Sequence, residues 1–408
     1  MPAGQHSPAR PPVLSGAPSS TPGVNKGPFL APVAPQYGGA SLADVLPSVL
    51  AVLGVPGAAD LLGLTDELIG VRRVAVLLVD GLGWHQIPTA APYAPTLAGL
   101  TATAGRPLTC GFPSTTPTSL VTLGTGTASG AHGVLGFTLR VPGTDRVLNH
   151  IEWSGEPPPL RWQPVPTQLE RARAAGVAVT VVSRPEFGGT GLTVAANRGG
   201  DYRGAAGVDA LAATMLAALA AGSGPTLVSG YHPDVDRHGH LSGVDSMPWR
   251  TAVSEVDGLL ARLVDGLPPD AALLVTADHG QLNVPAGHRF DLDTDPRLTA
   301  GLQVVAGEPR VRYLHVAPGA TEDVRAAWSE VLGPAARVLT RDEAVATGWF
   351  GPVPEDHLRR IGDVVVVCND TYAVLASRSE SPVLSRLVGF HGADTAAEMT
   401  IPLLVVRG

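Results

Sequence analysis

The sequence contains almost no lysine. Of the 28 basic residues in the 408-residue chain, only Lys26 is a lysine and the others are arginine. This scarcity excludes mechanisms that need a lysine in the folded part of the chain, including Schiff-base chemistry and the lysine-containing phosphate loop of P-loop proteins. Charged residues make up 16% of the chain and hydrophobic residues 44%, so we expect most of it to be packed rather than disordered.

Cysteine, long apolar runs and positive charge are also scarce. Cys110 and Cys368 could pair, but two cysteines form no disulfide framework. No apolar run approaches the ~18 residues of a membrane span. A net charge of −8 argues against general affinity for nucleic acid or anionic membranes. Residues 1–40 are rich in Pro, Ser and Gly and lack the apolar region of a secretion signal, so we expect a disordered leader and a cytoplasmic protein.

Short, nearly continuous apolar runs recur along the chain and alternate with stretches of helical length. The runs are rich in β-branched residues, which is typical of strands buried on both faces of a mainly parallel sheet. We expect strands at 74–79, 177–182, 225–230, 271–276, 363–368 and 401–406. We expect helices at 168–176, 208–222 and 249–267. The predicted fold class is α/β, with three layers in which helices flank a mainly parallel sheet.

The segment 291–362 departs from this pattern. It contains the apolar stretch VRYLHV (311–316) and a helical stretch near 321–332 before the sheet pattern resumes. We interpret the segment as a small inserted cap subdomain. The predicted catalytic domain then comprises residues 41–290 and 363–408.

The segment YHPDVDRHGH, residues 231–240, places two aspartates and three histidines in ten positions after a predicted strand. Asp236 and His240 are four residues apart, so on one helical turn both side chains can face the same metal ion. An isolated Asp-x-x-x-His is more often an ordinary solvated loop. The interpretation as a metal site therefore depends on the other ligand-type residues of the chain.

Similar side chains follow other predicted strands. Because ligands of an open α/β sheet bind at the carboxyl ends of the strands, we expect these groups to meet at one edge of the sheet. They are Asp80 in VDG, Asp278 and His279 in ADHG, and His391 in the late segment GFHGAD. Together with Asp236 and His240 they predict a metal cluster with aspartate and histidine ligands.

The stretch GFPSTTPTSLVTLGTGTASGAHG, residues 111–133, could be a solvated linker or could carry a reactive hydroxyl. The order of the pieces along the chain favours the second interpretation. A strand ends in Asp-Gly, then come F-P-S/T-x-T, T-G, H-G, D-x-x-G-H, A-D-H-G and a late H-G. This order resembles the alkaline phosphatase superfamily and is most similar to its type I phosphodiesterase and nucleotide pyrophosphatase branch. The resemblance covers roughly residues 70–405.

The resemblance implies roles for individual residues. Thr116 matches the nucleophile, because Thr122, Thr125, Gly126 and His132 then fall at the family's offsets. It also implies two zinc ions, one held by Asp236, His240 and His391 and the other by Asp80, Asp278, His279 and the Thr116 oxygen. It further implies a small-molecule phosphate ester as the substrate.

The chemistry of these residue types agrees with that assignment. A threonine hydroxyl has too high a pKa to attack phosphorus at neutral pH unless its alkoxide is stabilised, as a bound Zn²⁺ can do. Mixed Asp and His ligands suit zinc, with manganese and iron as alternatives. We therefore expect a metal-dependent hydrolase of phosphate diesters or pyrophosphates that works through a phosphothreonine intermediate on Thr116.

Two departures from the family pattern bear on the substrate. Pro117 stands where the nucleotide-cleaving members carry an aromatic residue that stacks on the base, and Phe137 stands where they carry a phosphoryl-contacting asparagine. Phosphoryl contacts then need another source, for which Arg184 and Arg237 are candidates. Trp84 and His85, just after Asp80, could line the pocket. His132, His232 and His238 are expected to have structural or solvent-facing roles.

Several alternatives stay open at this point. A phosphomonoesterase or a phosphonate hydrolase is the closest, because the related phosphonoacetate hydrolases share the threonine and the ligand set. A sulfatase is disfavoured because FPSTTPT lacks the Cys or Ser of C/S-x-P-x-R, and a metal-dependent phosphoglycerate mutase because it needs a serine nucleophile. A non-catalytic relative is least favoured, because every ligand position holds a competent residue. The sequence leaves the oligomeric state open.

Overall fold

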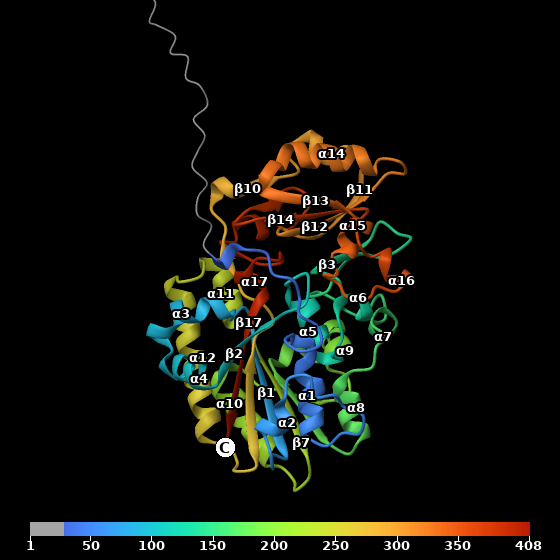
Figure 1. Cartoon of the computed structure of the whole chain (residues 1–408). Helices are drawn as coiled ribbons and strands as arrows, with labels where there is room; N and C mark the ends of the chain where they lie inside the picture. The colour runs from blue at the N-terminus through green and yellow to red at the C-terminus, as the bar shows by residue number, and fades with distance from the viewer. Residues whose placement is uncertain (1–27) are drawn as a thin grey trace, which may run out of the picture.

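Two sheets define the layout of the computed structural model, which describes residues 28–408 (Figure 1). Residues 1–27 of the predicted leader lie outside the described residues. The larger sheet has seven strands in the order β2-β17-β8-β1-β7-β5-β6, and the smaller has four in the order β11-β12-β14-β13. In Figure 1 the smaller sheet lies above one end of the larger sheet, with α14 on its outer side.

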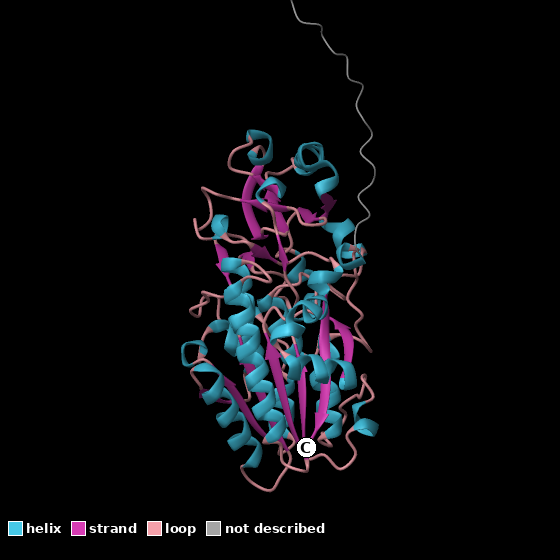
Figure 2. Cartoon of the chain, turned by 90° about the vertical axis from the view of Figure 1, so that its left-hand side faces the viewer, coloured by secondary structure: helices cyan, strands magenta, loops and turns pink. Residues whose placement is uncertain are grey.

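The larger sheet is parallel except for β17, which runs antiparallel to both of its neighbours. Its strands are β1 (Arg73–Val79), β2 (Gly105–Thr109), β5 (Ala178–Ser183), β6 (Asp201–Gly204), β7 (Thr226–His232), β8 (Ala271–Thr276) and β17 (Thr400–Arg407). Figure 2 shows helices on both faces of this sheet, which is why its central strands are nearly continuous runs of Val, Leu and Ala. The predicted fold class is confirmed.

Amphipathic helices form the outer layers. In α12, the buried residues Val253, Val256, Leu260 and Leu263 recur at three- and four-residue spacing, which places them on the face that is turned to the core. The helices before the smaller sheet are α1 (Val45–Val52), α2 (Leu64–Glu67), α3 (Ile87–Ala90), α4 (Pro95–Ala104), α5 (Thr116–Thr125), α6 (Ser129–His132), α7 (Pro159–Trp162), α8 (Gln168–Ala174), α9 (Gly191–Asn197), α10 (Gly207–Ala220), α11 (Asp234–Ser242) and α12 (Met247–Asp265). The predicted helices correspond to α8, α10 and α12.

The register of the larger sheet aligns the carboxyl ends of three central strands. Val79 at the end of β1 pairs with His232 of β7, and Leu78 pairs with Thr276 of β8. The residues that follow these strands, including Asp80 and Asp278, therefore leave the sheet side by side. This edge faces the smaller sheet in Figure 1.

The smaller sheet is antiparallel and has its own core. Its strands are β11 (Leu302–Glu308), β12 (Val311–Val316), β13 (Ala336–Thr340) and β14 (Val364–Cys368). Its helices and the C-terminal helix of the chain are α13 (Pro296–Thr299), α14 (Thr321–Leu332), α15 (Arg341–Ala346), α16 (Glu355–Leu358) and α17 (Ala396–Met399). Leu314, Val324, Trp328 and Val366 pack between this sheet and α14.

One strand lies in a different sheet from the one that the sequence predicts. The apolar run 363–368 is expected in the larger sheet, but β14 pairs with β12 and β13 of the smaller one. Local pattern could not decide this, because a valine run that is buried on both faces fits a central strand of either sheet. The division into a catalytic domain and a cap at residues 291 and 362 stays a prediction.

Residues 28–40 are ordered, although their composition predicts that they belong to the disordered leader. Val33 N–H donates to the carbonyl of Asp394 (2.7 Å), and Ala31 accepts a hydrogen bond from Ala396 N–H (2.8 Å). The Tyr37 hydroxyl donates to the carbonyl of Trp349 (3.1 Å). These partners lie near the other end of the sequence, so composition alone could not reveal them.

Short ladders connect the remaining loops. They are β3 (Thr138–Arg140) with β4 (Val147–Asn149), β9 (Leu282–Asn283) with β16 (Gly389–Phe390), and β10 (Arg289–Asp291) with β15 (Ala373–Leu375). Cys110 and Cys368 are both free and buried. None of the helices within residues 28–408 combines the length and the hydropathy that crossing a bilayer requires. The cytoplasmic location stays a prediction.

A tyrosine hydroxyl offers a test of how the smaller sheet is attached to the segment between α6 and β3. Tyr313 on β12 donates a hydrogen bond of 2.7 Å to the backbone carbonyl of Leu135. Tyr313→Phe removes this partner from a buried carbonyl, so we expect the free energy of unfolding in urea to fall by about 1–2 kcal/mol. Tyr372→Phe is the control, because the Tyr372 hydroxyl makes no hydrogen bond within residues 28–408. Equal midpoints of urea unfolding for Tyr313→Phe and Tyr372→Phe would show that the Tyr313 hydrogen bond does not stabilise the fold.

Candidate metal centre and active site

Three aspartates are buried together at the carboxyl edge of the larger sheet. Asp80 follows β1, Asp278 follows β8, and Asp236 lies in the first turn of α11, directly after β7. Gly81 permits their close approach, because its φ is +72° and a Cβ at this position would lie 2.8 Å from the Cα of Asp236. The Gly of the VDG segment is therefore required by the local geometry.

The environment of these carboxylates favours cations. Burial raises the pKa of Asp80 well above its usual range, and the nearby Asp278 and Asp236 carboxylates raise it further. Burial also raises the pKa of Asp236. One oxygen of Asp80 accepts a hydrogen bond from Tyr231, while the Asp80 Oδ1 and Asp278 Oδ2 atoms are buried without a hydrogen-bond partner among the described residues. Buried charge of this kind needs compensation, which a metal ion would supply.

Three histidines present their Nε2 atoms to the same space. His240, His279 and His391 each place Nδ1 within hydrogen-bond distance of a backbone carbonyl. The carbonyls, in that order, are those of Gly389 (2.8 Å), Gly280 (3.1 Å) and Ser114 (2.8 Å). Donation from Nδ1 leaves the Nε2 lone pair free for a metal. The Nε2 atoms of His240 and His391 are 3.0 Å apart, and two lone pairs at that distance fit a shared cation between or beside them.

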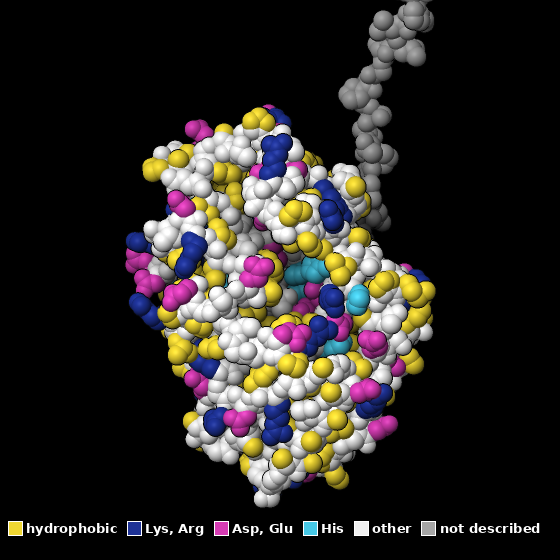
Figure 3. Space-filling view, turned by 180° about the vertical axis from the view of Figure 1, so that it is seen from behind, with side chains coloured by type: hydrophobic (Ala, Val, Ile, Leu, Met, Phe, Trp, Pro, Cys, Tyr) yellow, Lys and Arg dark blue, Asp and Glu magenta, His cyan; other side chains and the backbone are white. Residues whose placement is uncertain are grey.

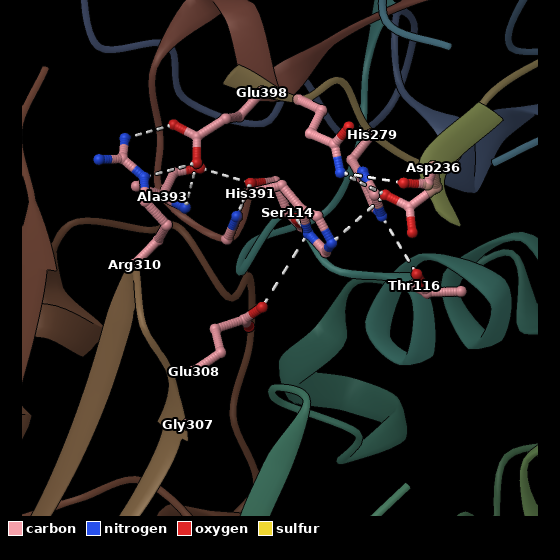
Figure 4. Close-up of polar contacts among 12 residues, drawn as sticks. Ser114, Thr116, Asp236, His279, Gly307, Glu308, Arg310, His391, Ala393 and Glu398 are labelled. Carbon is pink, nitrogen blue, oxygen red and sulfur yellow. Dashed lines mark hydrogen bonds and ion pairs between the residues drawn. The ribbon is translucent and has the colours of Figure 1, made fainter. Parts of the chain in front are cut away.

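The ligand atoms form two overlapping groups. In each group they lie within 4.8 Å of one another, and the groups are Asp236, His240 and His391, and Asp80, Asp236 and His279. Thr116 begins α5 and places its Oγ1 atom 3.1 Å from the Nε2 atom of His279, as Figure 4 shows. Asp278 Oδ2 lies 3.4 Å from the same nitrogen. The structure thus brings all the predicted ligands and the predicted nucleophile into one site.

The site opens into a cavity of about 660 Å³. Asp80, Thr116, Asp236, His240 and His391 line it, so the candidate ligands and the candidate nucleophile face the same space. In Figure 3 histidine and acidic side chains are visible inside a hollow in the molecular surface. A small molecule in this hollow could contact both the metal ligands and Thr116.

A family comparison agrees with this geometry. The model of the type I phosphodiesterase / nucleotide pyrophosphatase family matches residues 74–394. The chain belongs to this family. It is therefore an enzyme that acts on phosphoester bonds, as the sequence predicted. A search of curated protein sequences finds no match.

Solved structures show that this phosphodiesterase-family enzyme shares its fold with distant relatives. Murine ectonucleotide pyrophosphatase/phosphodiesterase 5 has a TM-score of 0.65 and 19% identity, over 82% of this chain and 87% of that one. Phosphonoacetate hydrolase from Sinorhizobium meliloti, in complex with phosphonoformate, has a TM-score of 0.61 and 19% identity, over 83% and 90%. An inactive variant of the murine protein has been solved in complex with AMP.

The two arginines that were candidates for phosphoryl contacts differ in position. Arg237, on α11 of this phosphodiesterase-family enzyme, lines the cavity. Arg184 is not among the lining residues; it donates a hydrogen bond to Asp234 and forms an ion pair with it. Asp234 also lies 3.8 Å from Arg237. Arg237 is the better placed of the two for a substrate.

Other predictions near the site have mixed outcomes. Phe137 lines the cavity, whereas Pro117 does not. Trp84 and His85 were candidates to line the pocket, but they do not, because both lie in a short 3-10 helix outside the cavity wall. They follow Asp80 closely in sequence, but the chain turns away from the site after Gly81.

The remaining histidines of the motifs are not in the ligand groups. His132 is buried behind α5, where its ring nitrogens contact the Thr122 hydroxyl (3.0 Å) and Val134 N–H (3.1 Å). His232 lies 3.8 Å from the Asp234 carboxylate, and His238 is half-buried on α11. These placements agree with structural roles.

Glu308 is a site residue that the sequence did not reveal. It ends β11 of the smaller sheet, lines the cavity and lies 4.0 Å from the Nδ1 atom of His391 (Figure 4). Burial raises the pKa of its carboxyl group to about 8. Nothing in the local sequence Gly-Glu-Pro marks it, because only the stacking of the smaller sheet over the edge of the larger one buries it.

A buried ion pair braces the loop that carries His391. Arg310 donates to both carboxylate oxygens of Glu398, at 2.9 and 2.6 Å, and both side chains are 0% exposed. Glu398 also accepts hydrogen bonds from Ala393 N–H (3.0 Å) and the Thr395 hydroxyl (2.6 Å). Figure 4 shows this pair beside His391. The Glu398 carboxylate thus binds both Arg310, which lies between β11 and β12 of the smaller sheet, and the segment that follows His391.

Removing the charge of the Glu398 carboxylate tests the contribution of the Arg310–Glu398 ion pair to stability. Glu398→Gln leaves the Arg310 guanidinium buried without its partner, so we expect a loss of about 3–5 kcal/mol in the free energy of unfolding. Urea denaturation measures this loss. Asp201→Asn, which breaks the exposed pair with Arg173, is the control and should cost less than about 1 kcal/mol. A similarly small loss of unfolding free energy in Glu398→Gln and Asp201→Asn would show that the buried ion pair does not hold this part of the fold.

Proposed function

We propose that the protein is a phosphodiesterase that cleaves small-molecule phosphodiesters, with Thr116 as its nucleophile at a two-metal site. One observation carries this proposal: the Thr116 hydroxyl lines the cavity together with Asp80, Asp236, His240 and His391, and it lies 3.1 Å from the Nε2 atom of His279. Thr116 is only 8% exposed, which limits the access of bulk water to the hydroxyl.

The donor set fits two divalent ions. Asp236, His240 and His391 would hold one ion, and Asp80, Asp278, His279 and Thr116 the other. The orphaned oxygens of Asp80 and Asp278 and the free Nε2 atoms support this assignment. When bound, the ions supply positive charge that lowers the pKa of the Thr116 hydroxyl and neutralises phosphoryl oxygens. Zinc suits this mixture of ligands, and manganese or iron are the alternatives.

The protein's own residues orient the reaction. The backbone carbonyls that bind Nδ1 of each histidine fix the ring tautomers, and Tyr231 fixes one oxygen of Asp80. The Thr116 oxygen attacks phosphorus in line with one ester oxygen, which leaves as an alcohol after taking a proton. Water then cleaves the phosphothreonine, releasing a phosphomonoester and restoring the Thr116 hydroxyl.

The charges around the cavity favour a diester. Among the described residues that line it, apart from the candidate ligands, Arg237 is the one cation, whereas Glu152, Glu308 and Glu380 are acids. A monoester dianion, or the extra carboxylate of a phosphonoacetate-type substrate, would need more positive charge than this wall offers. A phosphomonoesterase or phosphonate hydrolase is therefore the second candidate. We also propose that the smaller sheet acts as a cap, because it contributes Glu308 to the wall.

Two chromogenic substrates separate these functions. We expect metal-loaded protein to hydrolyse bis-p-nitrophenyl phosphate with a kcat/KM at least tenfold above that for p-nitrophenyl phosphate. The reason is that a monoanionic diester suits a wall with more acids than cations. Asp278→Asn serves as the blank. A preference for the monoester would move the assignment to a phosphatase.

The nucleophile is tested by removing one hydroxyl. Thr116→Ala should lower kcat by at least about 10³-fold, because it removes the hydroxyl that forms the covalent intermediate. Metal analysis should still find the same number of ions per chain as in the wild type. Thr118→Ala, a buried threonine two positions along the same helix, is the matched control and should stay active. Full activity of Thr116→Ala with its metals bound would refute the assignment.

A further inference from the structure

The cavity extends well beyond the candidate metal ligands, and its outer wall is largely hydrocarbon. Aliphatic and aromatic side chains from α5, α9, α11 and the segment before β16 line it. They include Leu120, Leu123, Leu192, Leu241, Leu387 and Phe390. A volume of about 660 Å³ is typical of sites that enclose a drug-sized ligand, so the reacting phosphoryl group fills only a part of it.

Several hydroxyl groups on this wall already donate hydrogen bonds within the protein. The Thr193 hydroxyl donates to the carbonyl of Phe187 (2.7 Å), and the Thr138 hydroxyl donates to the carbonyl of Gly307 (2.8 Å). The Tyr202 hydroxyl donates to the carbonyl of Arg184. A substrate with many hydrogen-bonding groups would lose water there and find few partners, which is costly.

Ionic groups on the wall are also engaged or acidic. Glu380 pairs with Arg312, and Arg237 lies 3.8 Å from Asp234. Glu308 is buried. A second phosphate or a carboxylate on the substrate would therefore meet little free positive charge in this part of the cavity.

Two aromatic side chains of the wall, Phe187 and Tyr231, do not form a slot for a nucleobase between them. Phe187 and Tyr231 pack edge to face, with ring centroids 6.1 Å apart and planes at 61°. A base stacks between or upon parallel faces, which this pair does not offer. Phe137 adds apolar surface to the wall, and Pro117 lies outside it.

Two apolar side chains lie at the mouth of the cavity, beside the exposed residues Glu152, Arg237 and Ser381. Ile151 and Leu241 line it and are 47% and 50% exposed, respectively. Exposed apolar side chains next to a binding cavity mark a surface that another apolar group covers. Because they are continuous with the wall behind Thr116, that group would belong to the molecule whose phosphate reaches Thr116.

We infer that the substrate is a phosphodiester in which one ester group is a long, uncharged hydrocarbon chain, and that this chain occupies the apolar wall from Thr116 to Leu241. This inference rests on the proposed function, since it assumes that the phosphoryl group binds beside Thr116. It specifies the ester group that the enzyme selects, with the wall rather than the metal site as the source of selectivity.

A homologous series of esters tests the inference. Metal-loaded full-length protein would be assayed with methyl, butyl, hexyl and octyl p-nitrophenyl phosphate and with the p-nitrophenyl ester of thymidine 5′-phosphate. Each methylene that enters the wall should raise kcat/KM by a factor of up to about 4. We expect an increase of at least about 30-fold from methyl to octyl, and a thymidine ester no better than the methyl ester. Octylphosphonate should bind correspondingly tighter than methylphosphonate in calorimetry.

Variants at the mouth of the cavity test where the hydrocarbon chain of the substrate binds. The double variant Leu241→Ser/Ile151→Ser should lower the ratio of octyl to methyl kcat/KM at least about fivefold. Ile69→Ser/Met247→Ser is the matched control, because both residues are 70% exposed and lie outside the cavity wall, so the ratio should not change. An unchanged ratio in the mouth variant would overturn the assignment of the chain to this wall.

The outcomes separate failure of the inferred ester group from failure of the proposed phosphodiesterase function. Hydrolysis of all the esters at similar rates, or a thymidine ester better than the octyl ester, would overturn the inference and leave the phosphodiesterase function standing. Failure to hydrolyse any member of the series or bis-p-nitrophenyl phosphate would overturn the proposed function, and the inference with it.

Discussion

The mutual repulsion of three buried carboxylates is the constraint on which the site depends. Asp80, Asp236 and Asp278 lie together because parallel register brings three strand ends to one level. Burial and repulsion raise the pKa of Asp80, so an ionised cluster needs cations to be stable. The histidines around it, with Nδ1 directed at backbone carbonyls, complete the donor set without adding negative charge.

The smaller sheet is a part of this arrangement and not only a cover. Arg310 reaches Glu398, which in turn holds the backbone of Ala393, two residues after His391. The position of one candidate metal ligand thus depends on an ion pair that spans both parts of the chain. A buried pair of this kind contributes little net stability but is costly to break, so it fixes geometry more than it drives folding.

The wall of the cavity contributes to substrate selection, which the sequence motifs do not describe. The family to which the chain belongs acts on phosphoester bonds, and the candidate ligands and Thr116 are the residues proposed to carry that chemistry. Several hydroxyls on the wall donate to backbone carbonyls, and aliphatic side chains form much of the remainder. Binding energy from such a wall comes from desolvation of the substrate, so selection falls on its size and hydrocarbon content.

The sequence by itself determined the fold class and identified the candidate ligands, because Asp and His residues recur after several apolar strands and the carboxyl ends of those strands meet at one edge of the sheet. Only the tertiary structure decided in which sheet Val364–Cys368 lies, because the sequence of a strand that is buried on both faces does not identify the strands with which it pairs. It also decided that residues 28–40 are bound, that Glu308 enters the cavity and that Trp84 does not. These outcomes rest on contacts between segments that are distant in sequence, and local pattern contains no information about them.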